Sequence, residues 1–343
     1  MAPKYNIVLI IALFIAVSFV GIRYFDAKTG LPVTSRQIAD NSEAKQYHIV
    51  FLVTSPLLRL TIEGFKDKLS EIKEKNQIIE YTDINIEFTQ TNIKNAASFI
   101  AEKKADLIVT GQSQIPEIVK QIKTVPIISI LSSDPVKLGL AQSENGSGNN
   151  VVFFETGTYQ STGRRLELFL ELMPSAKKIL VIRGDDSLPT ANPAGMKYLS
   201  EAADKKNVLL TEKTFKNREE MNKFLLNYDF SQIDAVFRYP GTFVSANADL
   251  FFILESKIKK PLITLNRTEL ESGGILSYGP RYEEFGRAGA VIAQKILVNQ
   301  LNPATTPIQA PLNYELGINE RVAKNYGIEI PPSLRAKADY IIK

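Results

Sequence analysis

The stretch Tyr47-His48-Ile49-Val50-Phe51-Leu52-Val53, followed by Thr54-Ser55, decides the fold of this chain because its pattern recurs along the sequence. An apolar run ends in small polar residues, and a segment with helical spacing follows. Two further examples are Asp106–Val109 with Thr110-Gly111-Gln112-Ser113, and Pro126–Leu131 with Ser132-Ser133-Asp134. Such alternation is typical of parallel βαβ units. Ligands of open parallel sheets bind beyond the carboxyl ends of the strands, so these endings predict a site for a small polar molecule.

Two successive series of such units are predicted. The first has strands at 47–53, 84–89, 106–110 and 126–131 and helices at 58–75, 93–103 and 115–123. The second has strands at 151–154, 178–183, 208–211, 235–239, 262–265 and 273–277 and helices at 160–173, 194–205, 218–228, 243–257 and 283–298. The chain of 343 residues also exceeds the usual size of one hydrophobic core. We therefore expect an α/β fold of two Rossmann-like lobes with parallel sheets and an interlobe cleft.

The turn-rich stretch 143–150 marks the expected boundary between the lobes. Its Gly-Ser-Gly sequence lacks the lysine and the preceding strand of a phosphate-binding loop, so a plain crossing loop is expected. The expected division is residues 1–25 as signal peptide or membrane anchor, 26–45 as linker, 46–150 plus about 280–312 as lobe 1, and 151–279 plus about 313–343 as lobe 2. A chain that crosses more than once between two lobes favours a hinge.

The N-terminus indicates export. Lys4 precedes the apolar run Ile7–Ile22, and Arg23 follows it. A basic start before an apolar core is typical of a secretory signal, and the run is short for a membrane span of about 20 residues. The small residues of Ala16-Val17-Ser18 permit cleavage, whereas an uncleaved apolar helix would tether the protein to the membrane. Both alternatives predict a periplasmic protein or one held at the outer face of the cytoplasmic membrane.

Composition excludes several classes of function. The 41 basic and 37 acidic residues give a net charge of +4 without a clustered basic face, so no nucleic-acid partner is expected. Cys is absent and His48 is the only histidine, which removes thiol chemistry, disulfides and most metal sites. His48 lies inside an apolar run, where a structural role is expected. We predict no cofactor, no metal and no enzymatic activity.

The candidate ligand-binding residues lie at predicted strand ends. Hydroxyl and amide groups that could bind a carboxylate belong to Ser55, Thr110, Gln112, Ser113 and Ser133. Asp134 or Asp186 could accept a hydrogen bond from an ammonium group. Asp134 precedes Pro135, however, and such a residue often caps a turn.

Aromatic and hydroxyl side chains complete the expected site. Thr242 and Phe243 begin a predicted helix after Pro240-Gly241, and Tyr278 ends a predicted strand beside a crossing. An aromatic ring there would form a wall for the apolar part of the ligand. Tyr239 is a further aromatic candidate.

Three stretches carry a resemblance to a known family. They are Ser133-Asp134-Pro135-Val136 with Gly139-Leu140, Asn150-Val151 and Gly163–Leu168; Gly273–Pro280 with Tyr282, Gly286 and Arg287; and Leu316–Asn319 with Tyr326–Leu334, Ala336 and Ala338-Asp339. Together they resemble the ABC-transporter substrate-binding proteins that include tryptophan- and tyrosine-binding members. The resemblance implies a type I periplasmic binding protein fold, a small-molecule ligand such as an amino acid, and a partner permease with its ATPase. We expect a monomer that binds its solute by hinge closure.

Two stretches differ from the family pattern and leave the ligand open. Residues 153–158 read Phe-Phe-Glu-Thr-Gly-Thr where a Thr-Gly-Val-like sequence is common, and 183–189 read Arg-Gly-Asp-Asp-Ser-Leu-Pro in place of an Asn-x-x-Glu-x-Asn-Ser pattern. The first alternative function is a ligand-sensing module for a membrane signalling partner. The second is a cleft hydrolase with Asp134 or Asp186 as general base, although no matching second carboxylate or nucleophile is recognised.

Overall fold

The computed structural model describes residues 44–87, 89–186, 194–252, 259–310 and 313–343. The expected N-terminal apolar helix and nearly all of the linker lie outside these residues. Residues 44–343 form one compact unit. Among the described residues, no helix combines the length and the apolar character needed to cross a membrane.

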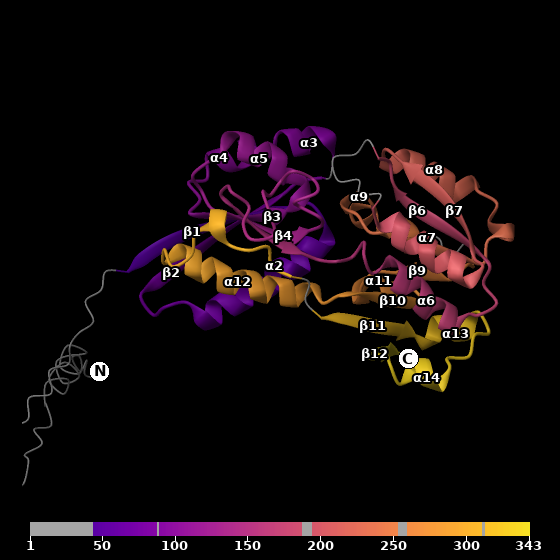
Figure 1. Ribbon diagram of the computed structural model, residues 1–343. Coiled ribbons are helices and arrows are strands. Elements are labelled where there is room, and N and C mark those ends of the chain that lie inside the picture. The colour runs from indigo at the N-terminus through magenta and orange to yellow at the C-terminus, as the bar shows by residue number, and fades with distance from the viewer. Residues whose placement is uncertain (1–43, 88, 187–193, 253–258, 311–312) are drawn as a thin grey trace, which may run out of the picture. The chain divides into compact units, whose positions relative to one another are not determined.

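The first sheet has five parallel strands (Figure 1). Their order is β2 (Gln77–Asn85), β1 (Lys45–Val53), β3 (Leu107–Gly111), β4 (Ile127–Ser132) and β5 (Val151–Glu155). Helices α2 (Pro56–Ile72) and α12 (Tyr282–Leu297) cover one face, and α3 (Gln90–Lys94), α4 (Ala96–Ala101) and α5 (Ile115–Gln121) cover the other. Alternate residues of β1 point into the apolar cores on the two faces of this sheet. Phe51 packs on the α2 side, and Val50 and Leu52 pack on the α4 side.

Helix α12 reaches the first sheet from far along the chain and packs closely on α2. The approach depends on Gly64 of α2 and Gly286 of α12. A Cβ atom at Gly286 would lie 1.8 Å from the Thr61 carbonyl oxygen, and one at Gly64 would lie 2.4 Å from the Glu283 carbonyl oxygen. The two helices therefore pack backbone against backbone, and no larger side chain fits between them.

The second sheet has seven strands. Their order is β12 (Tyr340–Ile342), β11 (Tyr314–Asn319), β10 (Leu276–Pro280), β9 (Leu262–Thr264), β8 (Ala235–Arg238), β6 (Lys178–Gly184) and β7 (Leu209–Phe215). All neighbours are parallel except β10 and β11, which are antiparallel, so the sheet is parallel as expected apart from this one pair. The antiparallel pairing follows because β11 returns from the other lobe in the opposite direction.

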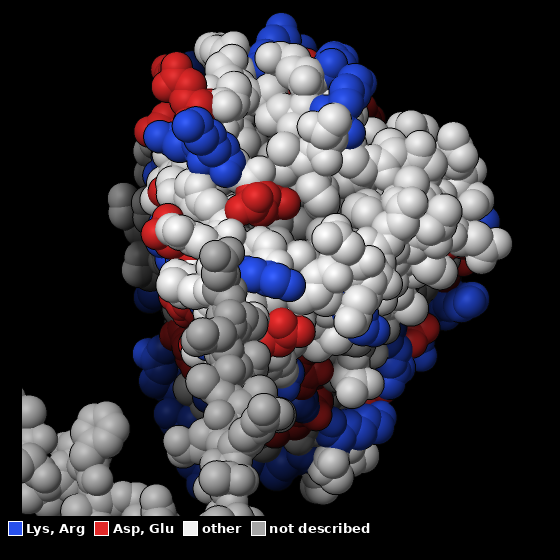
Figure 2. All heavy atoms as spheres, turned by 90° about the vertical axis from the view of Figure 1, so that its left-hand side faces the viewer, with Lys and Arg blue, Asp and Glu red and all other residues white. Residues whose placement is uncertain are grey.

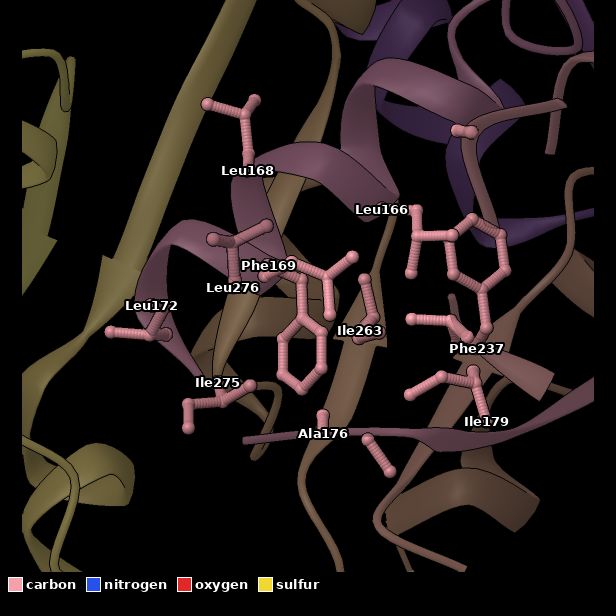
Figure 3. Packing of buried hydrophobic residues seen from close by; sticks show 14 of the residues in the cluster. Leu166, Leu168, Phe169, Leu172, Ala176, Ile179, Phe237, Ile263, Ile275 and Leu276 are labelled. Atoms are coloured by element: carbon pink, nitrogen blue, oxygen red, sulfur yellow. The ribbon is translucent and has the colours of Figure 1, made fainter. Parts of the chain in front are cut away.

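Helices cover both faces of this sheet. Helices α6 (Thr162–Leu172) and α7 (Ala194–Lys206) lie on one face, and α8 (Arg218–Asn227) and α9 (Thr242–Ala246) lie on the other. Figure 3 shows Phe169 of α6 among Ile263 and Leu276 of the sheet. The short elements are η1 (Gln112–Gln114), η2 (Phe230–Gln232), α11 (Arg267–Glu271), η3 (Pro303–Thr305), α13 (Glu320–Asn325) and α14 (Pro332–Arg335).

The chain crosses between the sheets three times, after β5, after β10 and before β11. We expected residues 151–154 to open the second lobe, but β5 pairs with β4 and places Val151 opposite Ile127. All four apolar residues of β5 are buried, since alternate ones enter the two cores of the first lobe. The outer edge of β5 is covered by Gln309, which exchanges backbone hydrogen bonds with Phe153 and Glu155 at 2.8 and 2.9 Å.

Other boundaries differ locally from the sequence predictions. Strand β2 occupies 77–85 rather than 84–89, because this edge strand is half exposed and contains no apolar run. The helix predicted at 93–103 is divided at Asn95, which ends α3 and begins α4. The strand predicted at 273–277 lies at 276–280, and the helix predicted at 243–257 begins as α9, which ends at Ala246.

Figure 2 shows the face of the molecule at the left of Figure 1. On this face, basic and acidic side chains are interspersed around an uncharged area. The charge pattern of the described residues there provides no continuous basic surface of the kind that follows a nucleic-acid backbone.

Candidate functional site

A cavity of about 190 Å³ lies between the carboxyl-end loops of the two sheets. It exceeds the roughly 150 Å³ of a cavity that accepts benzene. The first lobe and the crossing after β5 contribute hydroxyl, amide and apolar groups, from Ser55, Leu57, Gln112, Ser113, Pro116, Leu131, Ser133, Leu138, Leu140, Thr156, Thr158 and Tyr159. The remaining lining residues are Gly241, Thr242, Ser245, Leu265 and Tyr282. None of these described lining residues is an acid, a lysine, an arginine or a histidine.

Strand-end loops position the polar groups of the first lobe. The Ser55 hydroxyl caps α2 by accepting a hydrogen bond from the Leu58 backbone N–H at 3.3 Å. The Gln112 side chain joins the ends of β3 and β4, because it donates to the Ser133 carbonyl at 3.0 Å and accepts from the Ser133 N–H. The Ser113 hydroxyl is buried and has no hydrogen-bond partner among the described residues. It is therefore available to a ligand in the cavity.

On the second lobe, the cavity wall rests on a buried charged pair. Arg238 at the end of β8 donates to the Ser245 hydroxyl at 2.5 Å and lies 3.0 Å from a carboxylate oxygen of Glu269. Ser245 in turn donates to the Gly241 carbonyl at 3.0 Å. Gly241 has φ of 139°, a conformation that a side chain would strain. This turn places Thr242 and Ser245 at the cavity.

A second buried arginine lies behind the same wall. Arg165 of α6 is 0% exposed and donates to the backbone carbonyls of Tyr278 at 2.9 Å and Arg238 at 3.3 Å. Burial, and then the charge of Arg238, lower the pKa of Arg165 to about 10. Burial raises the pKa of Tyr282, whose hydroxyl lies within electrostatic reach of Arg238, Glu269 and Arg165. The guanidinium of Arg165 remains charged at neutral pH.

Five of the ten residues predicted from the sequence line the cavity, namely Ser55, Gln112, Ser113, Ser133 and Thr242. The other five do not. Thr110 is buried and its hydroxyl bonds to the Leu52 carbonyl at 3.2 Å, because its side chain faces the inside of the lobe. Phe243 belongs to the apolar core beneath α9.

The two predicted ammonium acceptors are engaged elsewhere. Asp186 is 60% exposed and pairs with Arg183 through two contacts of 2.6 and 3.1 Å. Asp134 has φ of 48° and accepts from Gln160 at 3.3 Å, so the turn interpretation describes its backbone better. Gln160 also donates to Glu155 at 3.2 Å.

The predicted aromatic wall lies at a different place. Tyr278 stacks on Tyr314 with ring centroids 5.4 Å apart, and Tyr239 contacts Tyr159 at 5.6 Å within the second lobe. The aromatic rings at the cavity belong instead to Tyr159 and Tyr282.

Sequence reasoning missed three sets of site residues. Thr156, Thr158 and Tyr159 follow an apolar run in the same way as Thr54-Ser55, and this signal could have identified them. A charged Arg238 at the end of the apolar run Ala235–Phe237 is a second signal. Tyr282 carries no such signal, because only the crossing before α12 brings it to the cavity.

The profile of the family described as ABC transporter substrate binding protein matches residues 47–342. The chain belongs to this family. It is 25% identical over 288 residues to the Tyrosine-binding protein of Clostridioides difficile (strain R20291). The aligned region covers 83% of this chain and 81% of that protein.

Two solved structures show the same fold as this family member. One is the ABC domain in complex with L-Trp from Streptococcus pneumonia, with a TM-score of 0.76, 21% identity and coverage of 88% of this chain and 100% of that one. The other is the ligand-free, open structure of a substrate binding protein with adhesive properties from Clostridium difficile, with a TM-score of 0.62, 25% identity and coverage of 87% and 99%. These likenesses confirm the two-lobed type I periplasmic binding protein fold.

Proposed function

We propose that this substrate-binding protein is the extracytoplasmic receptor of an ABC importer, which captures a small polar solute and delivers it to a membrane permease. The observation that carries the proposal is the cavity whose wall is shared by the loops of both sheets. A ligand there contacts both lobes at once. Such a ligand favours the closed arrangement by its differential affinity for that state.

The chemistry of the cavity supports binding rather than catalysis. Its polar lining consists of neutral hydroxyl and amide groups, and its ionisable lining residues, among those described, are Tyr159 and Tyr282. Burial raises the pKa of both phenols, so neither is a base at neutral pH. A general acid or base would need a pKa near the working pH.

We also propose a location, partners and ligand contacts for the protein. The expected signal peptide or anchor at residues 1–25 would place it in the periplasm or at the outer face of the cytoplasmic membrane. There it would act as a monomer beside a permease and its ATPase. We propose Ser55, Gln112, Ser113, Ser133 and Thr242 as ligand contacts, joined by Ser245 and Tyr282.

The test is a thermal-shift screen of the purified chain against amino acids, carboxylates, nucleobases, sugars and short peptides. A solute at about 100 times its dissociation constant stabilises the folded state by roughly 2.7 kcal/mol. We expect one class of solute to raise the Tm and the shift to shrink in Ser133→Ala. Ser231→Ala, at an exposed 3-10 helix of the second lobe, is the control and keeps the full shift. A folded protein that no solute stabilises would contradict the receptor function.

A further inference from the structure

The second-lobe wall of the cavity contains more positive than negative charge. Arg165 and Arg238 are 0% and 1% exposed, and among the described residues Glu269 pairs with Arg238, while Arg165 pairs with no carboxylate. Arg165 Nη2 and Arg238 Nε have no hydrogen-bond partner among these residues. Within the part of the chain that the structure describes, one unit of buried positive charge is therefore left without a carboxylate counter-charge. Such a charge is costly unless something pairs with it.

The cavity offers the place where this charge can be balanced. Ser245 accepts a hydrogen bond from Arg238 and lines the cavity, and Tyr282 lines it within electrostatic reach of both arginines. No hydrogen-bond partner of the Tyr282 hydroxyl is found within the described ranges, so this group can donate to a ligand. A negatively charged group at this end of the cavity would face a hydroxyl donor backed by two guanidinium groups.

Glu269, and the carboxylates of Asp134 and Glu155 next to the lining residues Ser133 and Thr156 in sequence, accept hydrogen bonds within the protein. Glu269 accepts from Arg238 at 3.0 Å and from the Leu265 N–H at 3.1 Å. Asp134 and Glu155 share the Gln160 side chain. Apolar residues form much of the remaining lining, namely Leu57, Pro116, Leu131, Leu138, Leu140 and Leu265. The described lining thus suits an anion with an apolar body and provides no charged acceptor for an ammonium group.

We infer that the solute is a monocarboxylate with an apolar or aromatic body and no α-ammonium group, bound with its carboxylate toward Tyr282 and Ser245 and the positive charge of Arg165 and Arg238. This inference rests on the proposed receptor function and specifies its ligand class. A carboxylate complements the excess charge of the wall, whereas a zwitterion brings an additional positive charge that the described lining does not match.

The experiment is isothermal titration calorimetry of the full-length chain with matched ligands. The carboxylates are 3-phenylpropanoate, indole-3-propanoate and 4-methylpentanoate, each compared with its amide and with the corresponding amino acid, L-phenylalanine, L-tryptophan or L-leucine. We expect at least one carboxylate to bind, its amide to bind at least about 10-fold more weakly, and its amino acid to bind no more tightly.

Two neighbouring arginines of α6 provide a matched pair of variants. Arg165→Gln keeps a donor for the Tyr278 carbonyl but removes the buried charge, while Arg164→Gln removes an exposed charge that pairs with Glu167. Arg165→Gln is expected to weaken the carboxylate by about 10- to 100-fold and to leave the amide unchanged. Arg164→Gln is expected to bind as the wild type does. Tyr282→Phe, which keeps both arginines, provides a second test with a larger loss for the carboxylate than for the amide.

The outcomes separate this inference from the proposed function. An amino acid that binds at least 10-fold more tightly than its carboxylate would overturn the inference, as would equal losses for carboxylate and amide in Arg165→Gln. Binding of neutral sugars or nucleobases alone would overturn it while supporting the receptor function. A folded protein that binds none of these solutes would overturn both.

Discussion

The substitution Glu269→Gln tests whether the buried Arg238 beneath the cavity depends on the negative charge of Glu269. Glu269 is buried, and its carboxylate pairs with Arg238 while accepting the Leu265 N–H. Glutamine keeps the shape and one acceptor but removes the carboxylate that pairs with Arg238 among the described residues. Removing one member of a buried ion pair costs about 3–5 kcal/mol, so the free energy of unfolding should fall by that amount. The group is shielded from solvent, so the loss should change little with salt concentration.

The assay is urea unfolding followed by far-ultraviolet circular dichroism at low and high salt. Glu271→Gln is the control, because Glu271 forms an exposed pair with Arg267 on the same short helix. Such a pair contributes up to about 1 kcal/mol, so this variant should remain close to the wild type. Equal stability of the two variants would refute the argument that Arg238 depends on Glu269 for its counter-charge.

Three further predictions concern packing, the unpaired hydroxyl and pH. Gly286→Ala should destabilise the protein by at least about 1–3 kcal/mol in urea unfolding, because its Cβ would overlap the Thr61 carbonyl of α2. The control Val291→Ala, on the exposed side of α12, should cost less than about 1 kcal/mol. Equal costs for the two variants would contradict the close packing of α12 on α2. Ser113→Ala should raise the free energy of unfolding by up to about 1 kcal/mol while weakening solute binding, since the hydroxyl is buried and has no hydrogen-bond partner in the described part of the chain. Unchanged affinity would remove Ser113 from the site. Burial raises the pKa of Glu155, so the folded state binds its proton more tightly and stability is lost as the pH rises through that pKa. Glu155→Gln should therefore stabilise the protein at pH 7, and the gain should vanish below about pH 4 in thermal melts; a gain that persists in acid would contradict burial as the cause.

Much of the architecture could be predicted because the central strands are buried on both faces. Strands β1, β3 and β4 read as continuous apolar runs, and their polar endings identified Ser55, Gln112, Ser113 and Ser133 as cavity residues. This success reflects the geometry of parallel sheets, in which carboxyl ends gather at one edge. The edge strand β2 was misplaced because its exposed face carries polar residues.

The remainder of the site depends on contacts between distant parts of the chain. Tyr282 reaches the cavity because α12 returns to the first lobe and packs on α2, where Glu283 lies against Gly64 and Gly286 against Thr61, 219 and 225 residues away in sequence. Arg165 belongs to α6 and Arg238 ends β8, so they come into contact only because α6 packs on the second sheet. Tyr278 and Phe243 were predicted as wall residues, but their neighbours in space turn them toward other rings and the core. The spacing of these residues along the sequence does not show which of them lie together in space.

Whether both lobes bind the solute can be seen directly in a crystal structure of the protein with the solute that gives the largest thermal shift. We expect electron density for that solute in the cavity between the two sheets, in contact with Ser133 of the first lobe and with Ser245 or Tyr282 on the opposite wall. Density for the solute at another surface, or contacts confined to one lobe, would show that the cavity is not a binding site shared by both lobes.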